Sequence, residues 1–159
     1  PAAPEAAKGL KKTDWIDVQE DKMNLYQPGI CTDVIYDMDA SDARAVRMPG
    51  STNEWATSVW FRDIKLPVSK KIDVYATIKV KKKAASGPAF TIGIYDTVNR
   101  EYPATQVVKI EDIKSDGYVD YKLGTFMPKD GWYVYIAPPG NAELVEYVQV
   151  DRLFFIKGK

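Results

Sequence analysis

The sequence predicts an all-β protein, a jelly-roll β-sandwich of two antiparallel sheets with about ten strands. Apolar side chains recur at every second position, most clearly at Ile72, Val74, Ala76, Ile78 and Val80, with polar or amphipathic residues between them. A period of two is typical of a strand with one buried face. Turn signals rich in Gly, Pro and Asp separate such segments, and no segment has an apolar stripe at helical spacing.

The other expected strands are short alternating or apolar segments between those turns. They cover residues 15–18, 23–26, 33–36, 45–48, 57–61, 90–95, 105–110, 118–126, 132–136 and 145–156. Residues 1–12 are rich in Ala, Pro and Lys and are expected to be a flexible linker or leader. The length of 159 residues then fits a single β-sandwich domain over residues 13–159.

Composition argues against several classes of function. Lys and Arg total 22, as do Asp and Glu, so the chain lacks the basic excess typical of a nucleic-acid binder. Histidine, the commonest general base and transition-metal ligand, is absent, and Cys31 is the single cysteine. No phosphate-binding loop, nucleophile elbow or zinc spacing is present, and no apolar run is long enough to span a membrane.

Carboxylates offer the one route to catalysis. A glycosidase pair would have to come from residues such as Asp33, Asp37, Asp39, Asp42 and Glu54. The same acidic run has oxygen ligands suited to Ca²⁺, although its spacing does not match an EF-hand loop. Solvated loop charge is the more ordinary interpretation, because spacing alone cannot place two carboxyls across a sugar ring.

Aromatic residues give a more useful indication. Alternation in 132–136 places Trp132, Val134 and Ile136 on one face of a strand and Tyr133 and Tyr135 on the other. If the first face is core, the two tyrosines lie on an outer sheet surface, and Tyr75 and Tyr95 have the same outward phase in their own strands. Flat aromatic rings suit the C–H faces of sugars, but tyrosines are also common as plain cover for a sheet.

Two further residues complete the candidate binding set. Trp55 and Trp60 have opposite phases, so at most one should lie in the core, and Trp55 is the expected exposed one. Asn141, in a Pro-Pro-Gly-Asn loop, either binds a hydroxyl group or simply accommodates a turn. The candidate ligand-binding residues are Trp55, Tyr95, Tyr133, Tyr135 and Asn141.

Five segments together resemble a known group of domains. They are residues 37–48, 54–56, 93–96, 133–139 and 150–154. They resemble the jelly-roll accessory domains of bacterial secreted glycoside-hydrolase-like proteins. The run Asp-x-x-Ala-Ser-x-x-x-Ala-Val at 37–46 and the closing Val-Asp strand are similar to family 6 and family 35 carbohydrate-binding modules, which belong to the galactose-binding-like β-sandwiches.

The resemblance implies a function and several site properties. It implies a secreted or cell-surface, non-catalytic module that binds a polysaccharide or oligosaccharide beside a tethered catalytic domain. It also implies a structural Ca²⁺ near a first-strand Glu and a last-strand Asp, which correspond to Glu20 and Asp151. No other cofactor is expected.

Two other functions stay open at this point. A structural or protein–protein interaction module of a surface assembly would use exposed aromatics and strand edges equally well. A small glycoside-active enzyme ranks last, because no acid/base pair stands out.

Overall fold

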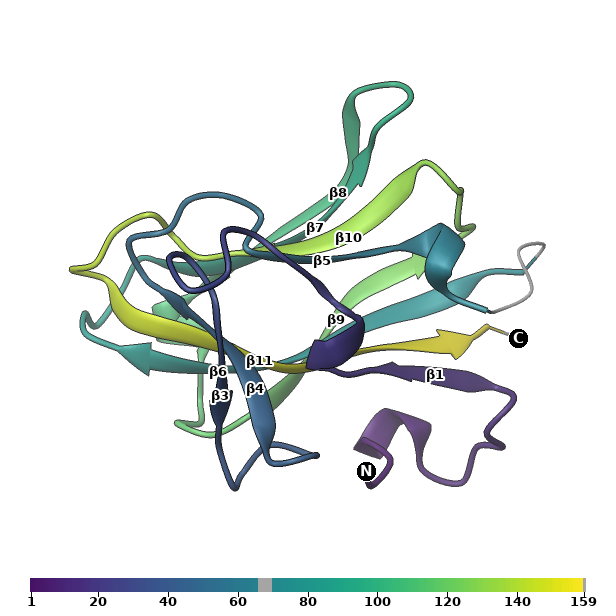
Figure 1. Ribbon diagram of the computed structural model, residues 1–159, viewed down its shortest axis with the longest axis horizontal. Helices are drawn as coiled ribbons and strands as arrows, with labels where there is room; N and C mark the ends of the chain where they lie inside the picture. The colour runs from purple at the N-terminus through teal and green to yellow at the C-terminus, as the bar shows by residue number, and fades with distance from the viewer. Residues whose placement is uncertain (66–69, 159) are drawn as a thin grey trace.

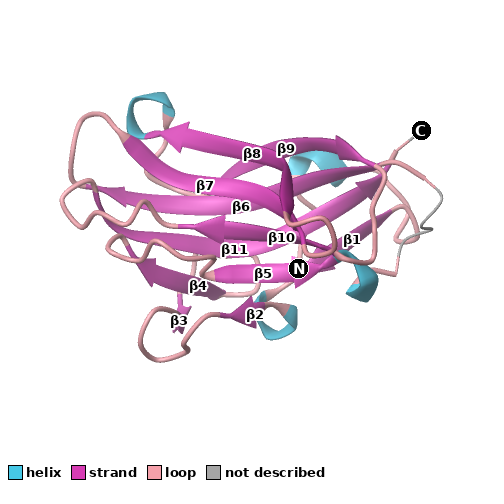
Figure 2. Ribbon diagram, turned by 90° about the horizontal axis from the view of Figure 1, so that it is seen from above, coloured by secondary structure: helices cyan, strands magenta, loops and turns pink. Residues whose placement is uncertain are grey.

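The computed structural model describes residues 1–65 and 70–158, and within these residues the strands form two antiparallel sheets packed face to face (Figure 1). Long strands dominate, and the helical segments are single 3-10 turns (Figure 2). The turns are η1 (Glu5–Ala7), η2 (Glu20–Lys22), η3 (Phe61–Asp63) and η4 (Ile110–Asp112). The predicted all-β sandwich is therefore confirmed. None of the helices among the described residues is long and apolar enough to cross a membrane.

The first sheet, sheet A, has the order β3-β4-β11-β6-β9, with β1 also paired to β11. Its strands are β1 (Trp15–Val18), β3 (Asp33–Tyr36), β4 (Arg44–Pro49), β6 (Ile72–Lys82), β9 (Val119–Phe126) and β11 (Val145–Lys157). The alternating residues expected to be buried in β6 line the core, because Val74, Ala76 and Ile78 are almost fully excluded from solvent.

The second sheet, sheet B, has the order β2-β5-β10-β7-β8. Its strands are β2 (Asn24–Leu25), β5 (Thr57–Trp60), β7 (Pro88–Asp96), β8 (Glu101–Lys109) and β10 (Trp132–Ala137). Its inward side chains, such as Phe90, Ile92 and Val134, share one apolar core with those of sheet A. Burial of this core is the main favourable contribution to folding.

A bulge in β11 changes which of its residues face the core. Val150 lies opposite Ile78 and is buried in the core, but the register shifts before the next pair. Strict alternation would then point Phe154 inward. Instead Leu153 and Phe155 join the core, and Phe154 lies on the outer face of sheet A. An extra residue in one strand has this effect because it reverses the alternation beyond it.

The N-terminal residues cover this outward phenylalanine. The ring of Phe154 stacks on Tyr75 with centroids 4.7 Å apart, and Ala7 of η1 packs against it and is buried. The backbone carbonyl of Ala2 accepts a hydrogen bond from Arg152 at 2.9 Å. Within the segment expected to be a leader, Ala3 and Ala7 thus pack on the apolar surface that the bulge creates.

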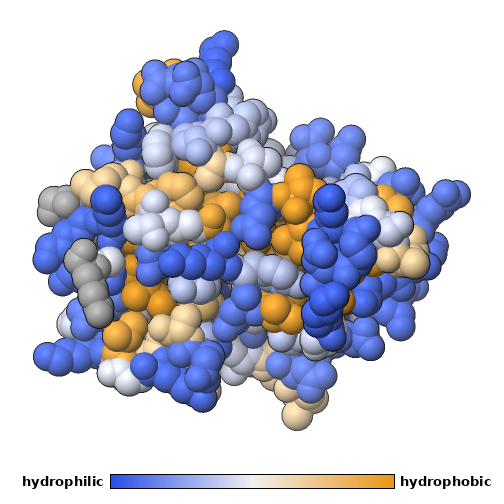
Figure 3. All heavy atoms as spheres, turned by 180° about the vertical axis from the view of Figure 1, so that it is seen from behind, coloured by the Kyte–Doolittle hydropathy of each residue, from blue (hydrophilic) through white to orange (hydrophobic). Residues whose placement is uncertain are grey.

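The surface seen in Figure 3 carries apolar side chains in small groups divided by hydrophilic ones. Among the described residues the large exposed apolar side chains come from many elements. They are Leu10, Ile30, Val34, Tyr36, Met38, Val98, Tyr102, Val107 and Met127. Scattered exposure of this kind is normal for a folded domain.

Asp37 connects the strands of sheet A on its outer face. Three donors from three segments meet one of its carboxylate oxygens, and they are Lys79 Nζ at 3.1 Å, Tyr118 OH at 2.8 Å and Gln149 Nε2 at 2.9 Å. The backbone N–H of Asp39 donates to the other oxygen. Burial alone would raise the pKa of Asp37, but these hydrogen bonds outweigh burial and lower its pKa to about 2.

The substitution Asp37→Asn tests how much the hydrogen bonds to this carboxylate stabilise the fold. A folded-state pKa below the ordinary value means that the charged carboxylate stabilises the fold above about pH 4, and that this contribution is lost as the pH falls towards 2. We expect the variant to lose roughly 2 kcal/mol of unfolding free energy at pH 7. Its stability should also vary less than that of the wild type between pH 4 and pH 2, as measured by urea denaturation.

The control is Asp39→Asn, since Asp39 is exposed on the same connection. The control should behave as the wild type at every pH. Equal stability of the two variants at pH 7 would refute the role given to Asp37.

Candidate functional site

The outer face of sheet B carries the aromatic residues that the sequence pattern placed there. On β10, Val134 and Ile136 are fully buried in the core, whereas Tyr133 and Tyr135 point to the opposite side. The prediction from alternation in this strand is therefore confirmed. β10 is the central strand of sheet B, so its two tyrosines stand in the middle of the face.

Strand register turns these residues into a row of rings. Tyr133 lies opposite Trp60 on β5 and opposite Tyr95 on β7. Its ring centroid is 5.2 Å from that of Trp60 and 5.6 Å from that of Tyr95. Neighbouring rings at these separations and tilted angles attract one another beyond simple burial. The row therefore fixes the rings before any ligand arrives.

Tyr135 lies flat because its cross-strand neighbour is a glycine. Gly93 is paired with Tyr135, and Thr105 on β8 is paired with Gly93. A Cβ atom on Gly93 would stand 2.6 Å from Cζ of Tyr135, closer than real atoms approach. The missing side chain lets the ring cross β7 and leaves the residue only 8% exposed. Tyr135 thus forms a floor rather than a projecting group.

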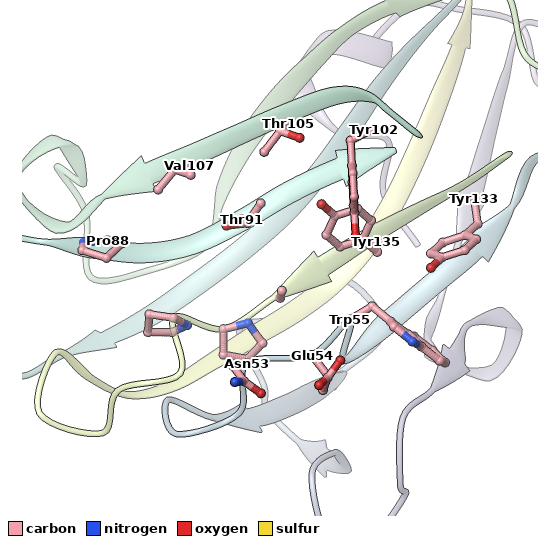
Figure 4. Close-up of a pocket in the computed structure, with 13 residues that line it drawn as sticks. Asn53, Glu54, Trp55, Pro88, Thr91, Tyr102, Thr105, Val107, Tyr133 and Tyr135 are labelled. Carbon is pink, nitrogen blue, oxygen red and sulfur yellow. The ribbon is translucent and has the colours of Figure 1, made fainter. Parts of the chain in front are cut away.

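Two other aromatic residues flank this floor. Trp55 comes from the segment before β5 and Tyr102 comes from β8, and both border the same hollow (Figure 4). The Tyr102 ring is 6.2 Å from the Tyr135 ring, and Tyr102 is 62% exposed. The hollow has a volume of about 560 Å³. Its lining residues are Asn53, Glu54, Trp55, Pro88, Thr91, Tyr102, Thr105, Val107, Tyr133, Tyr135, Ala137, Pro138 and Pro139.

A second hollow lies on the same sheet face. It has a volume of about 460 Å³ and shares Trp55 and Tyr133 with the first hollow. Its lining residues are Asn24, Leu25, Trp55, Ser58, Trp60 and Tyr133. The rings of Trp55 and Tyr133, with centroids 6.2 Å apart, therefore form a ridge between two depressions of one groove.

The chemistry of the groove is that of neutral polar ligands with apolar faces. Burial raises the pKa of both Tyr133 and Tyr135, so their hydroxyl groups stay protonated and can donate hydrogen bonds at any ordinary pH. Hydroxyl and amide groups from Thr91, Thr105 and Asn53 border the same hollow. Rings for stacking and a few fixed polar groups are the usual components of a small-ligand site.

The structure brings together three of the five predicted ligand residues. Trp55, Tyr133 and Tyr135 line the first hollow. Tyr95 has the predicted outward phase but acts through its contact with Tyr133 and does not line the hollow. Asn141 is exposed outside the hollow, and its side-chain oxygen accepts the Glu143 N–H at 2.9 Å, which is the turn role.

Sequence reasoning missed Trp60 and Tyr102. The prediction that Trp55 and Trp60 face opposite sides treated residues 55–61 as one continuous strand. In the structure β5 begins at Thr57, and both tryptophans border the second hollow. Tyr102 lies outside the expected strand 105–110, because β8 begins at Glu101 and includes Pro103. β8 is the edge strand of sheet B, where a proline is tolerated.

The carboxylates proposed for hydrolysis do not gather at the groove. Among the lining residues that the structure describes, Glu54 is the one acid. Asp37 is occupied by the donors on sheet A, and Asp33 borders a separate depression beside Arg47. Asp39 and Asp42 hydrogen-bond within the connection between β3 and β4 or near η2.

Glu20 and Asp151, the residues implied for Ca²⁺, are both buried. Ser41 donates to Asp151 through its backbone N–H and its hydroxyl. Burial and a hydrogen bond with Asp42 raise the pKa of Glu20 to about 7, and Oε2 of Glu20 has no hydrogen-bond partner. Over residues 1–65 and 70–158, no three acidic, Cys or His side chains come close enough to form a metal cluster.

The substitution Gly93→Ala tests the floor of the groove. The added methyl group should push the Tyr135 ring up into the hollow, because the ring occupies the place of the missing side chain. We expect a change in the near-ultraviolet circular dichroism of the tyrosines, with the strand content in the far ultraviolet unchanged.

Gly117→Ala is the matched control, since a Cβ there meets only Ser115 Oγ at an ordinary 3.6 Å. An unchanged tyrosine signal in Gly93→Ala would show that the ring does not depend on the glycine.

Comparison with known proteins shows similarity in structure only. No family model matches the sequence, and no curated protein matches it either. The CBM22-1 xylan-binding domain from Paenibacillus barcinonensis Xyn10C aligns with a TM-score of 0.58 and 13% identity, over 91% of this chain and 94% of that chain. The carbohydrate-binding module CBM6cm-2 from Cellvibrio mixtus lichenase 5A, in complex with cellotriose, aligns with a TM-score of 0.58 and 6% identity, over 91% and 98% of the two chains.

A third match is a multidomain protein. The Podospora anserina GH26-CBM35 β-(1,4)-mannanase aligns with a TM-score of 0.58 and 11% identity, over 93% of this chain but 28% of that chain. At these identities the likeness concerns the fold. The chain therefore has the β-sandwich fold found in carbohydrate-binding modules of families 6, 22 and 35.

Proposed function

We propose that this domain is a non-catalytic module that binds a polysaccharide in the aromatic groove of sheet B. The observation that carries the proposal is an open hollow floored by Tyr135 and bordered by the rings of Trp55, Tyr102 and Tyr133. Sugar rings present apolar C–H faces that fit such rings, while their hydroxyls need the polar groups that border them. A groove open to solvent suits a chain that continues past the site on both sides.

Two of the structural neighbours support a glycan ligand. One of them is a xylan-binding domain, and the other is a module in complex with cellotriose. A third neighbour contains a similar domain within a longer mannanase. By analogy, the domain would belong to a secreted or cell-surface bacterial protein and would be tethered to a catalytic domain, whose local substrate concentration it would raise.

The described residues that line the groove include no pair of acids, which supports binding rather than hydrolysis. Hydrolysis of a glycoside ordinarily uses two carboxyl groups on either side of the bond. Glu54 is the one acid among the described residues that line the hollows. A single carboxylate at the rim of the site can still accept hydrogen bonds from sugar hydroxyls, and this is the role given to Glu54 here.

The residues have separate roles in this proposal. Trp55 and Tyr133 stack on sugar rings, because their rings border both hollows. Tyr135 supplies the floor and a hydroxyl group, and Tyr95 holds Tyr133 in place. Asn141 lies outside the hollow, so a direct contact from Asn141 would require a ligand that extends over the loop 138–144.

The Ca²⁺ implied by the family resemblance would sit near Glu20. Oε2 of Glu20 lacks a hydrogen-bond partner, and burial together with the neighbouring Asp42 raises the pKa of Glu20, so a nearby positive charge would favour its ionised form. A hard cation with oxygen ligands would supply that charge. Asp151 is already satisfied by Ser41, so Asp151 would take part only if those hydrogen bonds were shared.

Removing either stacking ring should weaken polysaccharide binding without unfolding the domain. Trp55→Ala and Tyr133→Ala are each expected to weaken binding at least about tenfold, the usual effect of losing a central aromatic contact. The measurement is affinity electrophoresis in gels that contain single polysaccharides, including xylan, β-glucan and mannan, with melting temperatures recorded alongside.

Tyr36→Ala is the control, because Tyr36 is 71% exposed on β3 of the other sheet. The control should migrate as the wild type in every gel. The proposed function would be wrong if no polysaccharide of a broad panel slowed the migration of the wild-type protein.

Calcium should stabilise the wild type at pH 7.5. We expect millimolar Ca²⁺ to raise the melting temperature by about 5 °C relative to a chelator, as for any ligand that binds only the folded state. Glu20→Gln, which removes the charge and keeps the shape, should lose this response. Glu5→Gln is the control, since Glu5 is exposed. Equal melting with calcium and with chelator would contradict a calcium site.

A further inference from the structure

Charge is distributed unevenly along the aromatic groove. Glu54 is the one charged side chain among the described residues that line the two hollows, and it belongs to the first hollow. The other end carries the opposite charge. There, the guanidinium carbon of Arg62 lies 4.1 Å from the ring centroid of Trp60, which lines the second hollow.

Arg62 is held in place without having its charge neutralised. It lies on η3, directly after β5, and it is exposed. Stacking on Trp60 orients the planar guanidinium by contact with its face and leaves the N–H groups at its edge available. No ion pair in the described part of the chain involves Arg62. An oriented fork of donors beside a sugar-sized hollow is suited to a carboxylate.

We propose that the second hollow is a subsite for an acidic sugar, in which Arg62 binds the carboxylate of a uronic acid carried on a neutral polysaccharide chain. This inference rests on the proposed function, because it assumes that the groove binds a glycan. Trp60 and Tyr133 border this hollow, and the acidic sugar would contact the parts of their rings that Arg62 and the neighbouring ring leave open.

The first hollow accepts only neutral sugars in this arrangement. A carboxylate there would lie near Glu54 with no cation among the described lining residues to offset the repulsion. A chain that crosses the ridge of Trp55 and Tyr133 therefore binds in the direction that brings its acidic branch to Arg62. Charge at the two ends thus selects both the kind of chain and its orientation.

The test compares two forms of one polymer. The probes are glucuronoxylan and the same glucuronoxylan after its carboxylates have been reduced to neutral hydroxymethyl groups. We expect the full chain of this protein to bind the native polymer about fivefold more tightly than the reduced polymer at low salt. The difference should disappear in 0.5 M NaCl, because exposed charge pairs are screened.

Arg62→Gln should bind both polymers with the affinity that the wild type shows for the reduced one. Arg44→Gln is the control, because Arg44 is an exposed arginine on β4 of sheet A. The control should keep the fivefold preference.

The outcomes separate this inference from the proposed function. Equal binding of native and reduced polymer by the wild type overturns the acidic subsite and leaves polysaccharide binding intact. A preference that survives Arg62→Gln also overturns it. Failure to bind either polymer, while another polysaccharide of the panel is retained, removes the acidic subsite alone. Failure with every polysaccharide removes both.

Discussion

The register of β10 between β5 and β7 is the constraint on which the binding surface depends. It places Tyr133 between Trp60 and Tyr95, and Tyr135 across Gly93. Side chains alternate along a strand, so a slip of one residue would turn both tyrosines into the core and bring Val134 and Ile136 to the surface. The loss of buried apolar area makes that slip costly, so the core packing itself fixes the position of the rings.

The two sheets use their outer faces differently. On sheet A, Asp37 accepts hydrogen bonds from three other segments, and the N-terminal segment packs against the stacked rings of Tyr75 and Phe154. On sheet B the rings contact each other at tilted angles and border the two open hollows. Among the described residues, the open cluster of aromatic rings is therefore on sheet B, and this is why the proposed binding site is placed there.

Regular alternation made the fold predictable, and its interruptions limited the prediction of the site. The core face of β6 and the two faces of β10 follow directly from a period of two. Trp60 and Tyr102 were not predicted, because periodicity does not show where a strand begins or that a strand containing a proline lies at the edge of a sheet. The burial of Ala7 was not predicted for another reason. It depends on the bulge in β11, a tertiary feature that leaves no local pattern in the sequence.

The bulge in β11 has a practical consequence for any shortened form of this protein. A fragment that starts at Trp15 would keep every strand yet expose the phenylalanine that Ala7 covers, together with the guanidinium of Arg152. A solvent-exposed apolar patch on a sheet face promotes self-association. Precipitation of such a fragment would then reflect its trimmed boundary, whatever the properties of the sandwich itself.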